Sequence, residues 1–242
     1  MARARKTLLG MVAHELRTPL TVLNGYVSMM EEGSLGPAPS PWQRPLQVVG
    51  EKTRHLVALV EDLLSLERLE GGAMVPARVE VDLRQVIRQA MVRVAAHAEA
   101  LDARMSYELP GEPLLASVDP AQIGSVVDNL VNNALHYGSD QPRIRVTLRE
   151  SADGGAEILV EDWGVGIAAE NQEHVFDQFA RLDATGGGQV GTGLGLTIAR
   201  ELAERNSGCL ELMSSAPGRG STFRLRLPIL RSQPASEGVS TG

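Results

Sequence analysis

The chain has 242 residues, a formal net charge of −7 at pH 7 and only 3% aromatic residues. An acidic chain without lysine- or arginine-rich runs is poorly suited to binding nucleic acid, and so few aromatic side chains leave little for base stacking. The single cysteine, Cys209, excludes an intramolecular disulfide and a thiolate metal cluster, fits a reducing compartment and is expected in the core or in a strand.

Membrane and export signals are missing from the sequence. No apolar run reaches the length of a membrane span, and the first residues lack the apolar core of a signal peptide. We therefore expect a soluble, cytoplasmic chain. The first predicted helix starts almost at residue 1, so the sequence also fits the cytoplasmic portion of a longer protein with an upstream or membrane segment.

Residues 5–32 are predicted to form a long helix with one reactive-looking histidine. Apolar side chains recur at steps of four and three, as in packed helices, at Leu16, Leu20, Leu23, Val27 and Met30. His14 lies off this seam. Glu15 follows His14 directly, and Thr18 lies one turn after His14 on the same face. Pro19 cannot donate to the Glu15 carbonyl, which predicts a bend just after the histidine. Taken alone, His14 is better explained as an ordinary solvated residue of an amphipathic helix than as a reactive site.

A second helix is expected after a loop rich in glycine and proline at residues 33–41. Its apolar residues again step by three and four, and it should end near Glu70, where Gly71 and Gly72 terminate it. Two helices with a short connection form an antiparallel hairpin. Each helix has a wide apolar face, so we expect two copies to pair through residues 1–72 into a four-helix bundle.

The second half alternates strands and helices. Strands are expected at 79–81, 104–109, 114–118, 143–150, 156–161, 209–214 and 222–227, and helices at 83–101, 120–137 and 194–206. The strands at 104–109 and 114–118 surround a turn at 110–113. The fold class is therefore α+β with two domains: the helical hairpin at 1–72, and an α/β sandwich with a mixed sheet and helices on one face at 73–230. Residues 231–242 are expected to be a disordered tail.

Three segments of the second half are rich in candidate ligand-binding residues. On a helix, Asn129, Asn133 and His136 share one face, and amide oxygens suit a magnesium ion that carries phosphate. Asp162 ends a strand and is followed by Gly164 and Gly166, which suits an acid that accepts a hydrogen bond from a ligand amine.

The third segment, residues 186–196, is glycine-rich and leads straight into a helix, where free N–H groups and the positive helix end favour an anion. Taken singly, the asparagine segment is better explained by a polar helix face than by a metal site, and the glycine-rich segment is a weak motif that a flexible loop also explains. The spacing matches neither a dinucleotide fold nor a Gly-Lys-Ser/Thr phosphate loop, and no histidine or cysteine spacing fits a zinc site.

Taken in order, these segments resemble the sequence boxes of sensor histidine kinases of two-component signalling. His14-Glu-Leu-Arg-Thr-Pro-Leu20 resembles the H box, Asn129 to Tyr137 the N box, and Asp162-Trp-Gly-Val-Gly166 the first glycine box. Phe176 to Arg181 resembles the F box, Gly191-Thr-Gly-Leu-Gly-Leu196 the second glycine box, and Gly220 to Phe223 the last one. The resemblance extends from about residue 5 to residue 230.

The resemblance implies a dimeric phosphoacceptor hairpin and an ATP-binding domain of the Bergerat type. His14 would take the γ-phosphoryl group of ATP, Glu15 would orient the imidazole and take its proton, and Thr18 would position water in a phosphatase reaction on the partner's phosphoaspartate. Asn133, with Asn129, would hold Mg²⁺, and Asp162 would recognise the adenine amine. The residues expected to line ATP are His136, Tyr137, Gly164, Gly166, Phe179, Arg181, Gly191, Thr192, Gly193, Leu194, Gly195, Leu196 and Thr222, with residues 183–190 as a lid.

The implied reaction is autophosphorylation of His14 followed by transfer to an aspartate of a response-regulator receiver domain, together with dephosphorylation of that regulator. The chain departs from the family at His136, where many members carry lysine. Histidine is mostly neutral at pH 7, so the site loses a cation there. Two alternatives stay open: another ATPase of the Bergerat fold, and a non-catalytic dimeric scaffold or pure phosphatase. The sequence does not identify the stimulus, the cognate regulator, or whether phosphorylation occurs within one copy or between two.

Overall fold

The protein is represented by a computed structural model that describes residues 2–72, 74–180 and 191–230. It divides into two compact units. The first contains residues 1–75 and 173–201, and the second contains residues 76–172 and 202–242. The predicted tail at 231–242 and the predicted lid at 183–190 lie outside the described residues. The domain boundaries drawn from the sequence remain predictions.

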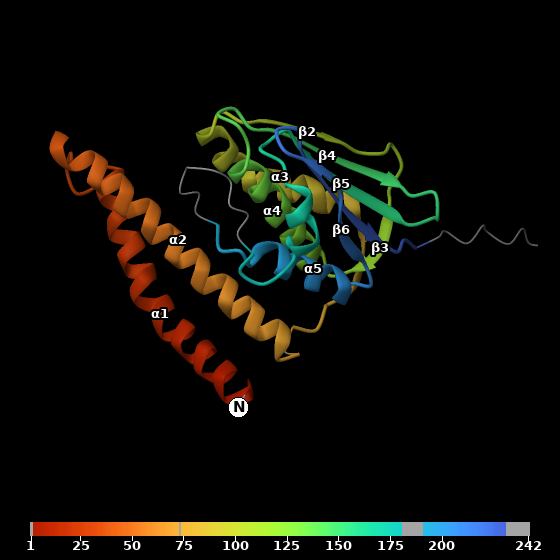
Figure 1. Cartoon of the computed structure of the whole chain (residues 1–242), viewed down its shortest axis with the longest axis horizontal. Coiled ribbons are helices and arrows are strands. Elements are labelled where there is room, and N and C mark those ends of the chain that lie inside the picture. The colour runs from red at the N-terminus through yellow and green to blue at the C-terminus, as the bar shows by residue number, and fades with distance from the viewer. Residues whose placement is uncertain (1, 73, 181–190, 231–242) are drawn as a thin grey trace, which may run out of the picture. The chain divides into compact units, whose positions relative to one another are not determined.

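A helical hairpin forms most of the first unit. Helix α1 spans Ala2–Glu31 without interruption at Pro19, and helix α2 spans Ser40–Glu70. The two helices lie side by side (Figure 1). Ala13, Val60 and Leu64 form the buried cluster of this unit, and Leu20 of the predicted seam packs against it. Leu16, Leu23 and Met30, three other members of that seam, are exposed in the single chain. Helix α2 ends as expected, because the Gly71 N–H bonds back to the carbonyl of Glu67 at 2.8 Å and Gly72 has a positive φ of 69°. The predicted hairpin is confirmed.

The second unit is built on a mixed sheet of five strands with the order β2-β4-β5-β7-β6. Only β2 and β4 run parallel; the other neighbouring pairs are antiparallel. Strands β1 and β3 form a separate antiparallel pair. The strand bounds are β1 Val79–Asp82, β2 Arg104–Glu108, β3 Leu115–Val118, β4 Arg143–Glu150, β5 Ala156–Asp162, β6 Cys209–Ala216 and β7 Gly220–Leu227.

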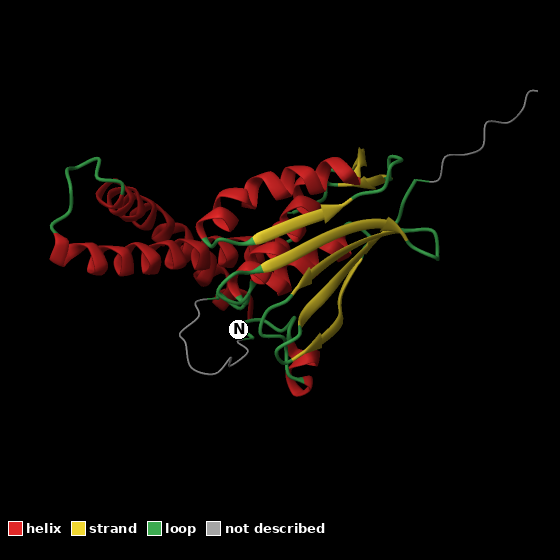
Figure 2. Cartoon of the chain, turned by 90° about the horizontal axis from the view of Figure 1, so that it is seen from above, coloured by secondary structure: helices red, strands yellow, loops and turns green. Residues whose placement is uncertain are grey.

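Helices α3 (Leu83–Ala100) and α4 (Pro120–His136) pack on one face of this sheet (Figure 2). Strand β4 shows why that face is covered: Ile144, Val146 and Leu148 alternate along it and are all buried. Helix α4 starts where the sequence predicts, because the Asp119 carboxylate accepts hydrogen bonds from the N–H groups of the first turn, with Pro120 at the first helical position. The predicted fold class is confirmed.

The strands that flank residues 110–113 do not pair with each other. Strand β2 joins the edge of the large sheet beside β4, whereas β3 pairs with β1. A short 3₁₀ helix at Ala169–His174 was also not predicted. The single cysteine, Cys209, is exposed at the start of β6, so it is a strand residue and not a core residue.

Helix α5 (Gly195–Arg205) is followed by a fully buried amide, Asn206. Its Oδ1 accepts from the Asp119 N–H at 2.8 Å, and its Nδ2 donates to Gln122 Oε1 and to the Leu202 carbonyl, each at 2.9 Å. These bonds fix the C-terminal end of α5 to the start of α4. Satisfying every polar atom of a buried amide in this way favours a single arrangement of the two helix ends.

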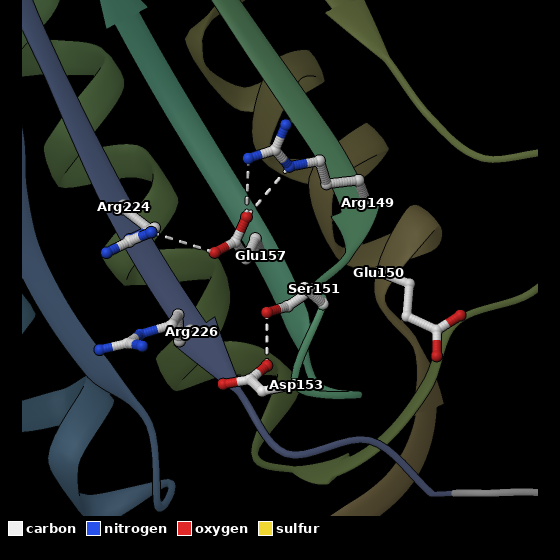
Figure 3. A pocket seen from close by; sticks show the side chains of 8 residues that line it. Arg149, Glu150, Ser151, Asp153, Glu157, Arg224 and Arg226 are labelled. Carbon is white, nitrogen blue, oxygen red and sulfur yellow. Dashed lines mark hydrogen bonds and ion pairs between the residues drawn. The ribbon is translucent and has the colours of Figure 1, made fainter.

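On the other face of the large sheet, arginine and glutamate side chains form a network of ion pairs. Figure 3 shows Glu157 between Arg149 and Arg224, whereas the Glu150 side chain points away from them. Glu157 is buried, accepts two hydrogen bonds from Arg149 at 2.9 and 3.0 Å, and contacts Arg224 at 3.3 Å. These three residues line a hollow together with Glu150, Asp153 and Arg226, so three arginines face three acids there.

Replacing Glu157 by alanine should lower the free energy of unfolding by roughly 1–3 kcal/mol, because hydrogen bonds to two guanidinium groups are lost. Urea unfolding of the variant measures this loss. Glu150→Ala, which removes an exposed acid from the same hollow, is the matched control and should change stability little. Equal stability of the two variants would contradict a structural role for Glu157.

Candidate active site

The H box lies on α1 with its predicted reactive side chains exposed. His14, Glu15 and Thr18 are all exposed, while Ala13, directly before the histidine, is buried against α2. Arg17 fixes this part of α1 to α2, because its guanidinium makes two hydrogen bonds to the carboxylate of Glu61, at 2.7 and 2.5 Å. The same bonds hold the pKa of the Glu61 carboxyl below its usual value. An accessible imidazole therefore lies on a fixed section of helix.

The N box divides into two sides of α4. On one side Asp128 forms an ion pair with Arg93 of α3 at 2.8 Å, and Asn132 lies 3.2 Å from the ring of His97. These two polar residues fasten α4 to α3. Asn129, Asn133 and His136 lie along another side, as the helical spacing predicts. The Asn129 amide nitrogen donates to the Ser125 carbonyl at 3.0 Å, which leaves its oxygen, the atom a metal ion needs, outside that bond.

His136 ends α4 in a half-buried position. Its ring meets Tyr137 edge-on, with ring centroids 4.9 Å apart. Burial, and secondarily the proximity of His97, lowers the pKa of His136, so the ring is neutral at pH 7. Its Nε2 is buried and has no hydrogen-bond partner among the described residues. An unpaired buried polar atom of this kind is costly unless a ligand or water satisfies it.

Substituting lysine for His136 should tighten ATP binding about fivefold, equivalent to about 1 kcal/mol, because a permanent cation replaces a neutral ring. Nucleotide titrations between roughly pH 5.5 and 8 measure the effect. In the wild type the affinity should rise at a pH lower than an ordinary histidine would require, because the pKa of His136 is lowered. Val92→Lys, which adds the same charge at an exposed position of α3, is the control. Unchanged affinity of His136→Lys over this pH range would refute the idea.

Asp162 ends β5 and is held by its neighbours. Its Oδ1 accepts from the Gly164 N–H at 2.8 Å, and the Ser221 N–H is a second donor. Burial nevertheless raises the pKa of this carboxyl above its ordinary value. A half-buried carboxylate that is positioned by backbone groups is suited to accept a hydrogen bond from a ligand amine.

The first glycine box has a second reason for its composition. A Cβ at Gly164 would collide with the carbonyl oxygen of Tyr137, and one at Gly166, where φ is 67°, would collide with the carbonyl of Ala216. The Val165 N–H also donates to Tyr137 at 3.1 Å. These glycines therefore let the chain after Asp162 approach the end of the N box, a role that sequence reasoning assigned only to ligand contact.

The last glycine box adjoins the same place. Thr222 on β7 pairs with Glu161, the neighbour of Asp162, and a Cβ at Gly220 would collide with the Asp162 carbonyl. Ser215, which sequence analysis missed, accepts from the Ile167 N–H at 2.8 Å and donates to the Gly220 carbonyl at 3.0 Å. The second unit thus brings together the N box, the first glycine box and the last glycine box.

The F box and the second glycine box meet in the first unit. The Phe179 N–H donates to the Gly193 carbonyl at 2.9 Å, and a Cβ at Gly193 would press on the backbone of Phe179. Leu194 is buried, and Gly195 and Leu196 begin α5. Thr192 donates to Asp62 of α2, a residue that sequence analysis did not single out because an acid at that spacing looks like any polar helix position. Arg181 lies outside the described residues.

The donor set can be tested against the predicted magnesium ion. Within the ranges that the structure describes, no group of three or more His, Cys, Asp or Glu could hold a metal. The predicted ligands Asn129 and Asn133 are amides one turn apart, which suits a hard ion whose remaining ligands are phosphate and water. These residues therefore fit an ion that arrives with a nucleotide and do not fit a resident metal centre.

Two family models match the chain, one in each half. Residues 4–72 match the His Kinase A (phospho-acceptor) domain, and residues 118–231 match the histidine kinase-, DNA gyrase B- and HSP90-like ATPases. The chain belongs to the sensor histidine kinases. Its second half is accordingly an ATP-binding domain of this family.

Relatives support this assignment over nearly the whole chain. The sensor protein kinase WalK of Staphylococcus epidermidis is 30% identical over 234 residues, which cover 93% of this chain and 37% of that protein. The sensor-like histidine kinase SenX3 of Mycolicibacterium smegmatis is 32% identical over 236 residues, covering 94% and 58%. The structure of full-length ShkA in complex with AMPPNP shares the fold, with a TM-score of 0.70, 23% identity, and coverage of 94% of this chain and 47% of that one.

The chain thus spans only 37% of the length of WalK and 58% of the length of SenX3. In the described part of the chain, none of the helices has the length and apolar character needed to cross a membrane.

Proposed function

We propose that this chain is an ATP-dependent protein-histidine kinase that phosphorylates its own His14 and passes the phosphoryl group to an aspartate of a response-regulator receiver domain. The observation that carries the proposal is the presence, in one chain, of an exposed histidine on a fixed hairpin and of an ATP-binding domain. The domain supplies a phosphoryl donor, and the hairpin supplies an acceptor.

The proposed transfer requires alignment and charge compensation more than covalent chemistry. A ring nitrogen of His14 forms a bond to the γ-phosphorus as the bond from that phosphorus to the bridging oxygen breaks, and ADP leaves with the electron pair. The imidazole proton passes to Glu15, its neighbour. Asp162 and Tyr137 would orient the nucleotide at the base end. The N–H groups of Gly191 to Leu196, apart from that of Leu194, which donates to Thr192, would bind phosphate oxygens.

Magnesium would be held by Asn133 and Asn129 together with phosphate oxygens and would compensate negative charge during the transfer. His136, which is neutral, would act as a hydrogen-bond donor or acceptor and not as a charge. Its unpaired Nε2 supports a polar ligand group at this place. Thr18, exposed one turn after His14, would position the water that hydrolyses the phosphoaspartate of the regulator.

The hairpin is proposed to act as a homodimer. On α1 and α2 large apolar side chains are exposed in a single chain, and burying them takes a second copy in a four-helix bundle. They are Val12, Leu16, Val22, Leu23, Tyr26, Met29 and Met30 on α1, and Trp42, Val48, Val49 and Leu56 on α2. The second partner is the receiver domain of a response regulator. Whether an upstream sensor or membrane segment belongs to the protein stays a proposal as well.

Incubation with γ-labelled ATP and Mg²⁺ tests the function. A phosphohistidine is labile in acid and stable in base, so the label should remain on the protein in alkali and be lost in acid. A non-kinase ATPase of the same fold would release labelled phosphate without retaining it. A scaffold or pure phosphatase would retain none and would still dephosphorylate an added phosphorylated regulator. Either of these results would refute the kinase proposal.

A further inference from the structure

Asp62 on α2 is a half-buried acid that the proposed reaction leaves unexplained. Its Oδ2 accepts a hydrogen bond of 2.6 Å from the hydroxyl of Thr192, the second residue of the second glycine box. The same hydroxyl accepts from the Leu194 N–H at 3.2 Å. Both residues belong to the first unit. The Thr192 hydroxyl is therefore fixed on both sides, by α2 and by the residue that precedes α5.

The position of Asp62 along the hairpin is defined by its neighbours. Val60 and Leu64, on either side of it, pack against Ala13, which directly precedes His14. Glu61, next to it in sequence, binds Arg17 of the H box. The contact with Thr192 therefore lies at the level of the H box along the hairpin. A hydrogen bond at this place fixes the second glycine box where the phosphoacceptor helix carries its histidine.

The contact also carries the F box with it. Phe179 is hydrogen-bonded to Gly193, and the Thr197 hydroxyl donates to the Phe176 carbonyl at 2.9 Å. The F box, the second glycine box and the first turn of α5 are thus linked to one another. The bond from Thr192 to Asp62 therefore links the described residues of the F box and of the second glycine box to α2. Burial raises the pKa of Asp62 and the Thr192 bond opposes that shift, which shows a carboxylate withdrawn from water beside a specific donor.

We propose that Asp62 is a positioning residue for autophosphorylation. By accepting a hydrogen bond from the Thr192 hydroxyl, it docks the second glycine box on α2 at the level of the H box. This inference rests on the proposed kinase function. It differs from a purely structural role in one measurable respect. A docking contact changes how often the second glycine box is held on α2, and it leaves the affinity for ATP unchanged.

The test compares Asp62→Ala with Asp62→Asn in the full chain. Single-turnover autophosphorylation is measured at saturating ATP, and the Kd for ATP is measured separately by titration. Asp62→Ala should phosphorylate about tenfold more slowly, which corresponds to about 1.4 kcal/mol on the barrier, with its Kd within about twofold of wild type. Asp62→Asn keeps an oxygen that accepts the Thr192 hydroxyl, so it should retain most of the rate. Glu67→Gln, which changes an exposed acid of the same helix, is the control and should match wild type.

Three results would overturn the inference: a wild-type rate for Asp62→Ala, a faster rate, or a rate that falls only because ATP binding weakens in parallel. A faster rate would identify the contact as a restraint on the loop and not as productive docking. Thermal unfolding of each variant separates loss of docking from loss of fold, and Asp62→Asn, which is isosteric, covers the case in which alanine destabilises the hairpin. If wild type itself incorporates no phosphate, the proposed function fails first; an active wild type with an equally active Asp62→Ala overturns this inference alone.

Discussion

Replacing His14 by glutamine should abolish incorporation of phosphate from ATP into the protein. Glutamine fills a similar volume and hydrogen-bonds like a neutral imidazole, but its amide nitrogen has no lone pair available to attack phosphorus. His14 is exposed on α1, so the substitution removes no core contact and the variant should fold. The measurement is labelling with γ-labelled ATP followed by acid and alkali treatment of the protein.

ATP binding provides the control for this variant. His14 is not among the residues predicted to line ATP, so the Kd of this variant for ATP should be unchanged. Thr18→Ala is the matched substitution one turn away: it should label normally and lose dephosphorylation of the regulator. Phosphate that still accumulates on His14→Gln with the same chemical stability would place the acceptor on another residue and would contradict the proposed role.

Substituting alanine for Asp162 should weaken ATP binding by roughly 10- to 100-fold, the effect of losing a hydrogen bond to a charged acceptor in a half-buried site. The backbone donors that now hold the carboxylate, Gly164 and Ser221, would lose their partner as well. Equilibrium titration with ATP measures the loss of affinity. Titration with GTP, whose base lacks the adenine amine, provides the comparison. Discrimination between the two nucleotides should largely disappear in the variant.

The pH dependence of ATP binding gives a second test of Asp162. Because burial raises the pKa of this carboxyl, it takes up a proton at a higher pH than an ordinary aspartate, and the protonated form is a poorer acceptor for the adenine amine. ATP affinity should therefore decline earlier as the pH falls. Glu150→Gln changes an exposed acid of β4 that pairs with the other end of β5 from Asp162, so it is the control and should preserve both affinity and pH profile. Equal affinity for Asp162→Ala and Glu150→Gln would remove Asp162 from the binding site.

Helices and strands were predictable where one local signal dominates. The steps of three and four along α1 and α2, the glycines after Glu70 and the Asp119-Pro120 start of α4 each reflect a short-range constraint that the sequence states directly. Strand pairing was less accessible. The parallel pairing of β2 with β4 joins segments separated by about forty residues, and nothing in residues 104–118 distinguishes it from a local hairpin.

The candidate site shows the same division. The types and order of Asn129, Asn133, Asp162 and the glycines could be recognised because their chemistry is unusual for a helix face or strand end. Gly164 and Gly166 were expected for the right positions and for an incomplete reason, because the carbonyls that exclude a Cβ there come from Tyr137 and Ala216, remote in sequence. Asp62 could not be recognised, since its role depends on a partner 130 residues away.

The attachment of α5 to α4 through Asn206 has a consequence for behaviour in concentrated salt. The groups that form this attachment are the side-chain amides of Asn206 and Gln122, the Asp119 N–H and the Leu202 carbonyl. None of these groups carries a net charge, and all four residues are buried. The Arg93–Asp128 pair between α3 and α4 is instead partly exposed, with the arginine side chain 46% accessible, and weakens as counterions accumulate. A rise in ionic strength should therefore first weaken the contact between α3 and α4, while the start of α4 stays attached to the end of α5.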